Sequence, residues 1–183
     1  MAPYDAFDQN VEINGQTVLA VVDGAMGKFS EKYYDLAMAA LAEEGIDDPA
    51  PDQWYSQQAW LNAFEGMAAD LEPHVLDRIG EQIPSVAEWP NDIETVPDAL
   101  RSINDAYQRN HRGGEIGSYQ FERLGEQTGA VTCHNPYPCP FDRGLIRGVA
   151  QKYAHLDAFV FLEETGATCR RDGDDSCRYT VHW

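Results

Sequence analysis

The spacing of the apolar residues changes two-thirds of the way along the chain, and this change limits the fold more than any other feature. Up to residue 110 the apolar residues recur about every 3.6 positions, which is typical of amphipathic helices. After residue 115 they alternate in short runs, which is typical of strands. Helices followed by strands favour an α+β fold with an antiparallel sheet.

Four helices are predicted in the first part, over 17–44, 53–70, 73–81 and 93–110. Thr17 is a suitable N-cap for the first helix, and the proline-rich segment 47–52 separates it from the second. We therefore expect residues 1–110 to form a helical subdomain.

Four strands and one helix are predicted in the last part. The strands are expected over 116–121, 130–133, 158–168 and 176–183, and the helix over 140–155. Residues 111–183 would then form a ββαββ subdomain, a four-stranded antiparallel sheet with one crossing helix. The helical part should pack on this sheet as one compact domain.

The charge balance is strongly acidic. The chain has 31 Asp and Glu against 13 Lys and Arg, a formal net charge of −18. Such a surface would repel nucleic acids and anionic membranes, so neither is an expected partner. Only Lys28, Lys32 and Lys152 are lysines, and this pattern is typical of a halophilic protein whose self-repulsion is screened by salt.

No apolar stretch approaches the roughly 20 residues that span a bilayer. The N-terminal segment also lacks the basic and apolar regions of a signal peptide. The expected location is therefore cytoplasmic.

The four cysteines form two pairs near the end of the chain, Cys133 with Cys139 and Cys169 with Cys177. Three interpretations compete: a zinc site of four thiolates, one or two disulfides that are structural or redox-active, and unligated buried thiols. We favour zinc, because the ββαββ order would bring a strand–helix loop and a hairpin together at one end of the sheet.

Two histidines, His134 and His182, are possible substitute ligands, but we interpret both as ordinary strand-end residues.

Cys139 also allows a thiol-dependent enzyme or a redox sensor. It precedes Pro140 at the start of a helix, where the helix dipole stabilises a thiolate. His134, Asp142 and Arg143 would complete the constellation, although Asp142 and Arg143 are equally suited to the first turn of a helix. No familiar catalytic motif accompanies them.

Two segments resemble the C-terminal half of the haem-nitric-oxide-binding (H-NOX) proteins and their haem-free relatives, the 4-vinyl-reductase-type small-molecule-binding domains. They are residues 135–150 (NPYPCPFDRGLIRGVA) and 169–183 (CRRDGDDSCRYTVHW). The resemblance implies helices packed on an antiparallel sheet with a crossing helix.

The resemblance also implies a structural zinc. Some H-NOX proteins bind it through two cysteines spaced like Cys169 and Cys177 and a ligand at the start of the crossing helix, which matches Cys139. These proteins place a histidine where this chain has Gly166. Cys133 would supply the missing ligand.

Haem binding is not expected to carry over. Haem-binding members hold the propionates through a Tyr-x-Ser-x-Arg signature, but the matching positions here are Thr132, His134 and Pro136. A proximal histidine is expected near residue 110, and only His111 is close. We interpret His111 as a helix-terminal residue that interacts with exposed carbonyl groups.

The sequence therefore predicts a non-enzymatic small-molecule-binding or sensory domain with a structural zinc. The ligand would be small and apolar or aromatic, and a homodimer or a signalling protein would be the partner. The expected pocket lies between helices and sheet, although each of its residues could equally belong to the core. The predicted lining is Trp54, Trp60, Phe64, Tyr107, Tyr119 and Phe121.

Overall fold

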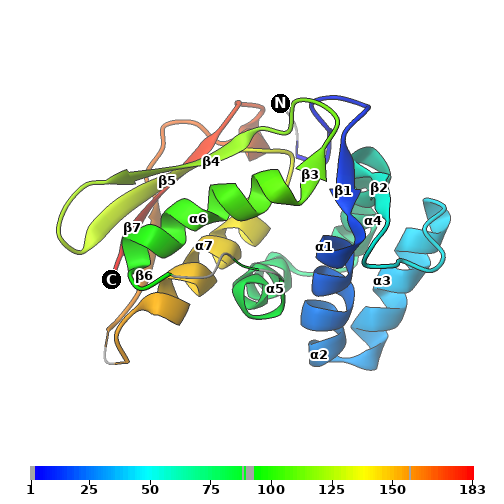
Figure 1. Ribbon diagram of the computed structural model, residues 1–183, viewed down its shortest axis with the longest axis horizontal. Coiled ribbons are helices and arrows are strands. Elements are labelled where there is room, and N and C mark those ends of the chain that lie inside the picture. The colour runs from blue at the N-terminus through cyan, green and yellow to red at the C-terminus, as the bar shows by residue number, and fades with distance from the viewer. Residues whose placement is uncertain (1–2, 88, 90–92, 157) are drawn as a thin grey trace.

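A computed structural model describes residues 3–87, 89, 93–156 and 158–183. It has the predicted α+β architecture, with a helical part beside a four-stranded antiparallel sheet (Figure 1). The strands of this sheet are β4 (Ser118–Arg123), β5 (Thr128–His134), β6 (Phe161–Glu164) and β7 (Cys177–His182), in the spatial order β4-β5-β7-β6.

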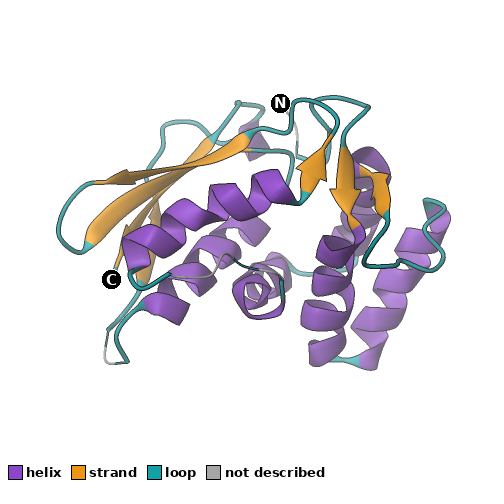
Figure 2. Ribbon diagram, in the orientation of Figure 1, coloured by secondary structure: helices purple, strands orange, loops and turns teal. Residues whose placement is uncertain are grey.

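Two helices cover one face of this sheet (Figure 2), α6 (Val96–Arg109) and the crossing helix α7 (Cys139–Tyr153). The strands alternate accordingly: Cys177, Tyr179 and Val181 of β7 are buried, while the residues between them are partly exposed. The register places Cys133 of β5 opposite Cys177. Paired residues of an antiparallel sheet project from the same face, so both thiols are on the helix side.

The helical part consists of short segments. They are α1 (Gly15–Leu19), the π-helical segment η1 (Ala20–Met26), α2 (Gly27–Phe29), α3 (Glu31–Glu43), α4 (Gln57–Ala69) and α5 (Pro73–Val86). The single helix predicted over 17–44 is wrong. Ser30 is extended and its hydroxyl accepts from the backbone N–H of Tyr33, so Ser30 ends one helix and caps the next.

A second small sheet was not predicted. Its strands are β1 (Glu12–Asn14), β2 (Trp54–Ser56) and β3 (His111–Arg112), in the order β2-β1-β3. Strands of two or three residues carry too little alternation to be recognised in a sequence. Because β2 takes Trp54–Ser56, α4 begins only at Gln57, later than predicted.

The connection before β7 also differs from the prediction. The strand predicted over 158–168 is limited to Phe161–Glu164, and Cys169 lies outside any strand. A 3-10 turn, η2 (Arg170–Asp172), follows Cys169 and ends at Gly173, whose φ of +94° is the left-handed conformation that glycine favours. This turn, rather than a regular hairpin, sets the position of Cys169.

Helices α5 and α7 pack at backbone distance. A Cβ atom at Gly80 would overlap the carbonyl group of Phe141, and one at Gly144 would overlap the carbonyl oxygen of Asp77. The sequence predicted that this helix ends near Gly80, but α5 continues to Val86. Gly80 is needed for the close approach of α7 and does not end the helix. Among the described residues, no helix combines the length and apolar character needed to cross a membrane.

Candidate functional site

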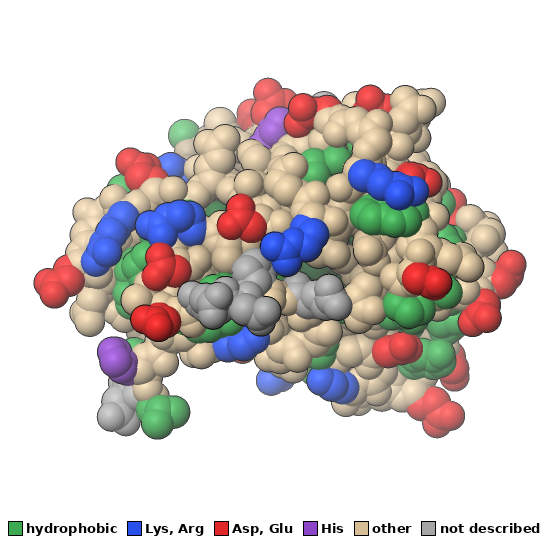
Figure 3. Space-filling view, in the orientation of Figure 1, with side chains coloured by type: hydrophobic (Ala, Val, Ile, Leu, Met, Phe, Trp, Pro, Cys, Tyr) green, Lys and Arg blue, Asp and Glu red, His purple; other side chains and the backbone are tan. Residues whose placement is uncertain are grey.

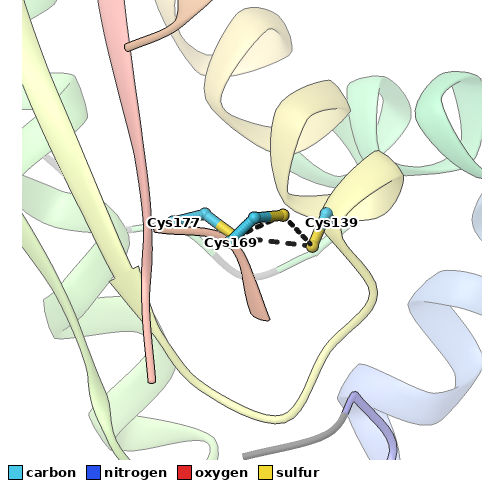
Figure 4. A group of neighbouring side chains, drawn as sticks. All are labelled: Cys139, Cys169 and Cys177. Carbon is cyan, nitrogen blue, oxygen red and sulfur yellow. Dashed lines mark hydrogen bonds between the residues drawn. The ribbon is translucent and has the colours of Figure 1, made fainter. Parts of the chain in front are cut away.

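Three cysteines from separate parts of the chain meet at one end of the sheet (Figure 4). Cys139 lies in the first turn of α7, Cys169 precedes η2, and Cys177 begins β7. All three are buried. The predicted convergence of the strand–helix loop with the last two strands therefore occurs for these three thiols.

The sulfur atoms form a nearly equilateral triangle. The Sγ–Sγ distances are 3.4 Å from Cys139 to Cys177, 3.6 Å from Cys177 to Cys169, and 3.9 Å from Cys139 to Cys169. In a tetrahedral zinc site with Zn–S bonds of about 2.3 Å, neighbouring sulfurs lie about 3.8 Å apart. The triangle thus has the dimensions of one face of such a tetrahedron.

The three thiols differ in their pKa values. A hydrogen bond from Cys139 lowers the pKa of Cys177 to about 5, while donating that bond raises the pKa of Cys139. The backbone N–H of Arg170 also donates to the Cys177 sulfur, over 3.2 Å. The pKa of Cys169 is raised, mainly by burial. The cluster can therefore hold a thiolate, which is the form that binds a metal.

Cys133, the fourth predicted ligand, does not belong to this cluster. It is fully buried, and burial together with the Asp142 carboxylate raises the pKa of its thiol well above the usual range. It lies opposite Cys177 in the sheet but interacts with Asp142.

A buried ion pair lies beside the cysteine cluster. Arg170 and Asp142 are 1% and 0% exposed, and the guanidinium donates to the carboxylate. Asp142 also accepts from the hydroxyl of Tyr119 over 2.5 Å and from the side-chain amide of Asn135 over 3.1 Å. The network joins η2, β4 and the start of α7. The sequence carries no signal for it, because most arginines are exposed.

The residues of the alternative thiol-enzyme constellation point elsewhere. His134 packs on Phe7, with 4.7 Å between ring centroids, and Arg143 binds Asp77 over 2.5 Å. Asp142 is occupied by Arg170. Cys139 therefore contacts two other thiols in place of a general base.

His182, the other substitute ligand, lies on β7 near the Thr128 hydroxyl, 3.3 Å from its Nδ1. Neither histidine is in the cysteine cluster.

A cavity of about 70 Å³ lies between the helices and the sheet. Its described lining is almost entirely apolar or aromatic. The lining residues are Thr17, Ala20, Trp60, Ile83, Ala87, Trp89, Ile103, Ala106, Tyr107, Asn110, His111, Tyr119, Tyr137, Phe141 and Leu145.

Three of the six aromatic residues predicted for a pocket line this cavity: Trp60, Tyr107 and Tyr119. Phe64 is core, stacked on Trp60 with 5.4 Å between centroids. The rings of Trp54 and Phe121 contact arginines, Arg112 at 4.2 Å and Arg101 at 5.4 Å. Periodicity could not separate these cases, because core and cavity residues share the same helix faces.

His111 faces the cavity as a neutral, hydrogen-bonded ring. Its Nδ1 lies 2.8 Å from the carbonyl oxygen of Tyr107, so Nδ1 carries the proton. Its Nε2 therefore accepts from the hydroxyl of Tyr137, 2.9 Å away, a contact that the sequence did not suggest. Burial lowers the pKa of His111 to about 4. The predicted interaction of His111 with a carbonyl group near the helix end is present, but that carbonyl group is buried and not exposed.

The side chains around the cavity would have to rearrange before haem could enter. The ring nitrogen that would bind iron, Nε2 of His111, accepts a hydrogen bond from the hydroxyl of Tyr137. The one buried arginine of the region, Arg170, is paired with Asp142 and not available to a propionate. The cavity is also far smaller than the roughly 300–1,000 Å³ of sites that hold larger ligands.

No protein-family model and no curated protein matches the chain. Solved structures of H-NOX proteins do. A mutant H-NOX protein from S. oneidensis in the Fe(II) state has a TM-score of 0.67 and 13% identity, and the match covers 93% of this chain and 95% of that one.

A mutant H-NOX protein from T. tengcongensis has a TM-score of 0.67 and 11% identity, covering 93% and 97%. An unliganded Fe(II) H-NOX mutant from K. algicida has a TM-score of 0.65 and 12% identity, covering 93% and 96%. The TM-scores establish a shared fold, and sequence identities this low support no conclusion beyond it. The chain has the fold of the H-NOX proteins.

Proposed function

We propose that the protein is a haem-free, non-enzymatic small-molecule-binding or sensory domain, stabilised by a structural zinc that Cys139, Cys169 and Cys177 hold. The triangle of sulfur atoms carries the zinc proposal, because its edges of 3.4–3.9 Å suit tetrahedral coordination. Bound zinc would offset two of the thiolate charges and tie α7 to the last strand.

Cys133 remains our proposed fourth ligand. It projects from the same face of the sheet as Cys177, directly opposite in the register. To reach the metal its thiol would have to turn away from Asp142, with which it now interacts. The Cys133 thiol would lose its proton on binding, and the bond between its thiolate and the metal would offset the loss of the interaction with Asp142.

The zinc proposal predicts about one zinc per chain in elemental analysis of protein purified with zinc present. Cys139→Ser should reduce this content to near zero, because a hydroxyl is a poor zinc ligand. Cys133→Ser should lose its zinc at a lower chelator concentration than the wild type. His134→Ala, which removes a histidine outside the cluster, should retain the metal.

Zinc retained by Cys139→Ser would contradict the three-thiol site. Unchanged chelator resistance in Cys133→Ser would remove Cys133 from the ligand set. A Cys139–Cys177 disulfide in protein prepared under reducing conditions would favour the redox-sensor alternative instead.

The partners follow from the cavity and the charge. A small apolar or aromatic molecule would occupy the cavity, and a second copy or a signalling protein would respond to it. The net charge of −18 argues against nucleic acid and anionic membranes. Reduced thiols suit a cytoplasmic location, which we include in the proposal.

A halophilic origin is also part of the proposal. Acidic side chains are spread over the surface, many of them at the edge of the view in Figure 3, and basic ones lie between them. Salt screens the repulsion among these acidic side chains. The temperature of the thermal unfolding midpoint should therefore rise as the KCl concentration is raised from about 0.1 M to about 3 M. A midpoint that is flat or falls over this range would contradict adaptation to high salt.

A further inference from the structure

Two buried polar side chains beside the cavity lack hydrogen-bond partners among the described residues. They are Gln57, through both atoms of its amide, and Trp60, through its indole Nε1–H. Each residue is 0% exposed. Leaving a buried donor or acceptor unpaired costs about 1–3 kcal/mol, so such groups in a folded protein usually meet a ligand or an ordered water.

The unpaired groups lie on one face of α4, three residues apart, and the part of the cavity that this face borders is called here its polar end. Trp60 lines the cavity together with Tyr107, His111 and Tyr137. Gln57 is not itself a lining residue, but it precedes Trp60 by three positions on α4 and so lies on the same face of that helix. The indole donor of Trp60 therefore borders the cavity, with the Gln57 amide about one helical turn away.

The neighbouring tyrosine hydroxyl groups already donate hydrogen bonds within the protein. The hydroxyl of Tyr107 donates to the carbonyl oxygen of Ile116 over 2.5 Å, and that of Tyr137 donates to His111. The other lining tryptophan, Trp89, donates its Nε1–H to the hydroxyl of Ser102 over 2.8 Å. The indole N–H of Trp60 can only donate, so an occupant that pairs with it must offer an acceptor, and the Gln57 amide N–H can donate to the same atom.

The occupant must also be uncharged and compact. No Asp, Glu, Lys or Arg is among the described lining residues, and His111 is neutral because burial lowers its pKa to about 4. An apolar cavity of about 150 Å³ holds one benzene ring. By the same measure, about 25 Å³ per non-hydrogen atom, the present cavity of about 70 Å³ has room for about three such atoms, and a fourth requires the walls to move slightly.

We propose that the cavity binds a compact neutral carbonyl compound whose oxygen accepts hydrogen bonds from Trp60 Nε1–H and the Gln57 amide. This inference rests on the proposed function and narrows it from any small molecule to one with a carbonyl acceptor at the polar end. The apolar walls would enclose the rest of the molecule.

Acetone and isobutene test the proposal, because they have the same shape and differ in one oxygen. A purely apolar cavity would strongly prefer isobutene, since removing a carbonyl from water without a partner costs several kcal/mol. We expect acetone to bind at least as tightly as isobutene in NMR titrations of the full chain. The indole Nε1–H proton of Trp60 should shift downfield with acetone only, and that of Trp89, already bonded to Ser102, should not.

Trp60→Phe removes the donor and should weaken acetone binding about tenfold without weakening isobutene binding. Gln57→Leu, a second variant in case Trp60→Phe does not fold, should act in the same direction. Preference for isobutene in the wild type would overturn the carbonyl proposal and leave a small-molecule domain in place. Binding of neither probe, with the indole bonded to water only, would overturn both.

Discussion

Replacing Arg170 with methionine is expected to destabilise the protein by about 3–5 kcal/mol, because the substitution leaves the Asp142 carboxylate buried without its cation. Both groups are almost fully buried, and no other cation pairs with Asp142 among the described residues. Tyr119 and Asn135 would still donate to the carboxylate, but they are neutral. Chemical denaturation monitored by tryptophan fluorescence would measure the loss.

The penalty should depend on pH in one direction. Burial already raises the pKa of Asp142 although Arg170 lowers it, so losing Arg170 raises it further. A carboxyl whose folded pKa exceeds its unfolded value of about 3.9 destabilises the fold as pH rises between the two values, by about 1.4 kcal/mol per unit. The Arg170→Met penalty should therefore be smallest near pH 4 and grow towards neutral pH.

Arg171→Met provides the matched control. Arg171 is the next residue, its side chain is 62% exposed, and its nearest carboxylate oxygen, on Glu164, is 3.8 Å away. Losing such a surface pair should cost less than about 1 kcal/mol. Equal effects of the two substitutions, or a penalty for Arg170→Met that does not change with pH, would contradict a buried ion pair at this position.

Replacing Gly144 with alanine is expected to cost about 3 kcal/mol or more, the upper part of the range for overpacked sites. The new Cβ would overlap the carbonyl oxygen of Asp77, which is backbone and cannot turn aside. Helices α5 and α7 would have to separate, and the pairing of Arg143 and Arg147 with Asp77 would be strained. A lowered thermal midpoint, with helical circular dichroism retained at low temperature, is the expected result.

Gly66→Ala should stabilise the protein, in contrast to Gly144→Ala. Gly66 lies within α4, and the nearest atom to a new Cβ would be that of Ala40 at an ordinary 3.9 Å. Alanine is favoured over glycine inside a helix by about 0.5–1 kcal/mol. A Gly144→Ala protein as stable as the wild type would show that α5 and α7 do not pack at backbone distance.

The arrangement of the elements was predictable because each period is sustained over many residues. The order of the crossing helix and the strands around it is enough to predict that Cys139, Cys169 and Cys177 lie at one end of the sheet, as the structure shows. The break at Ser30 was hidden because both flanking segments keep a helical period, and β1–β3 were hidden because each has only two or three residues.

The contents of the site were less predictable than its place. Whether Trp60 lines a cavity or Phe64 fills the core depends on side-chain packing that periodicity does not encode. The burial of Arg170 depends on Asp142, 28 positions earlier in the chain. The contact between His111 and Tyr137 likewise joins residues 26 positions apart.

Native mass spectrometry of the purified full chain, with zinc and haem both supplied during expression, tests the central claim most directly. The account predicts a mass increase of about one zinc per chain, lost with the chelator and in Cys139→Ser, and no haem adduct. A haem adduct at one per chain with an intense Soret band, abolished by His111→Ala, would contradict it. A folded chain that carries no zinc would contradict it equally.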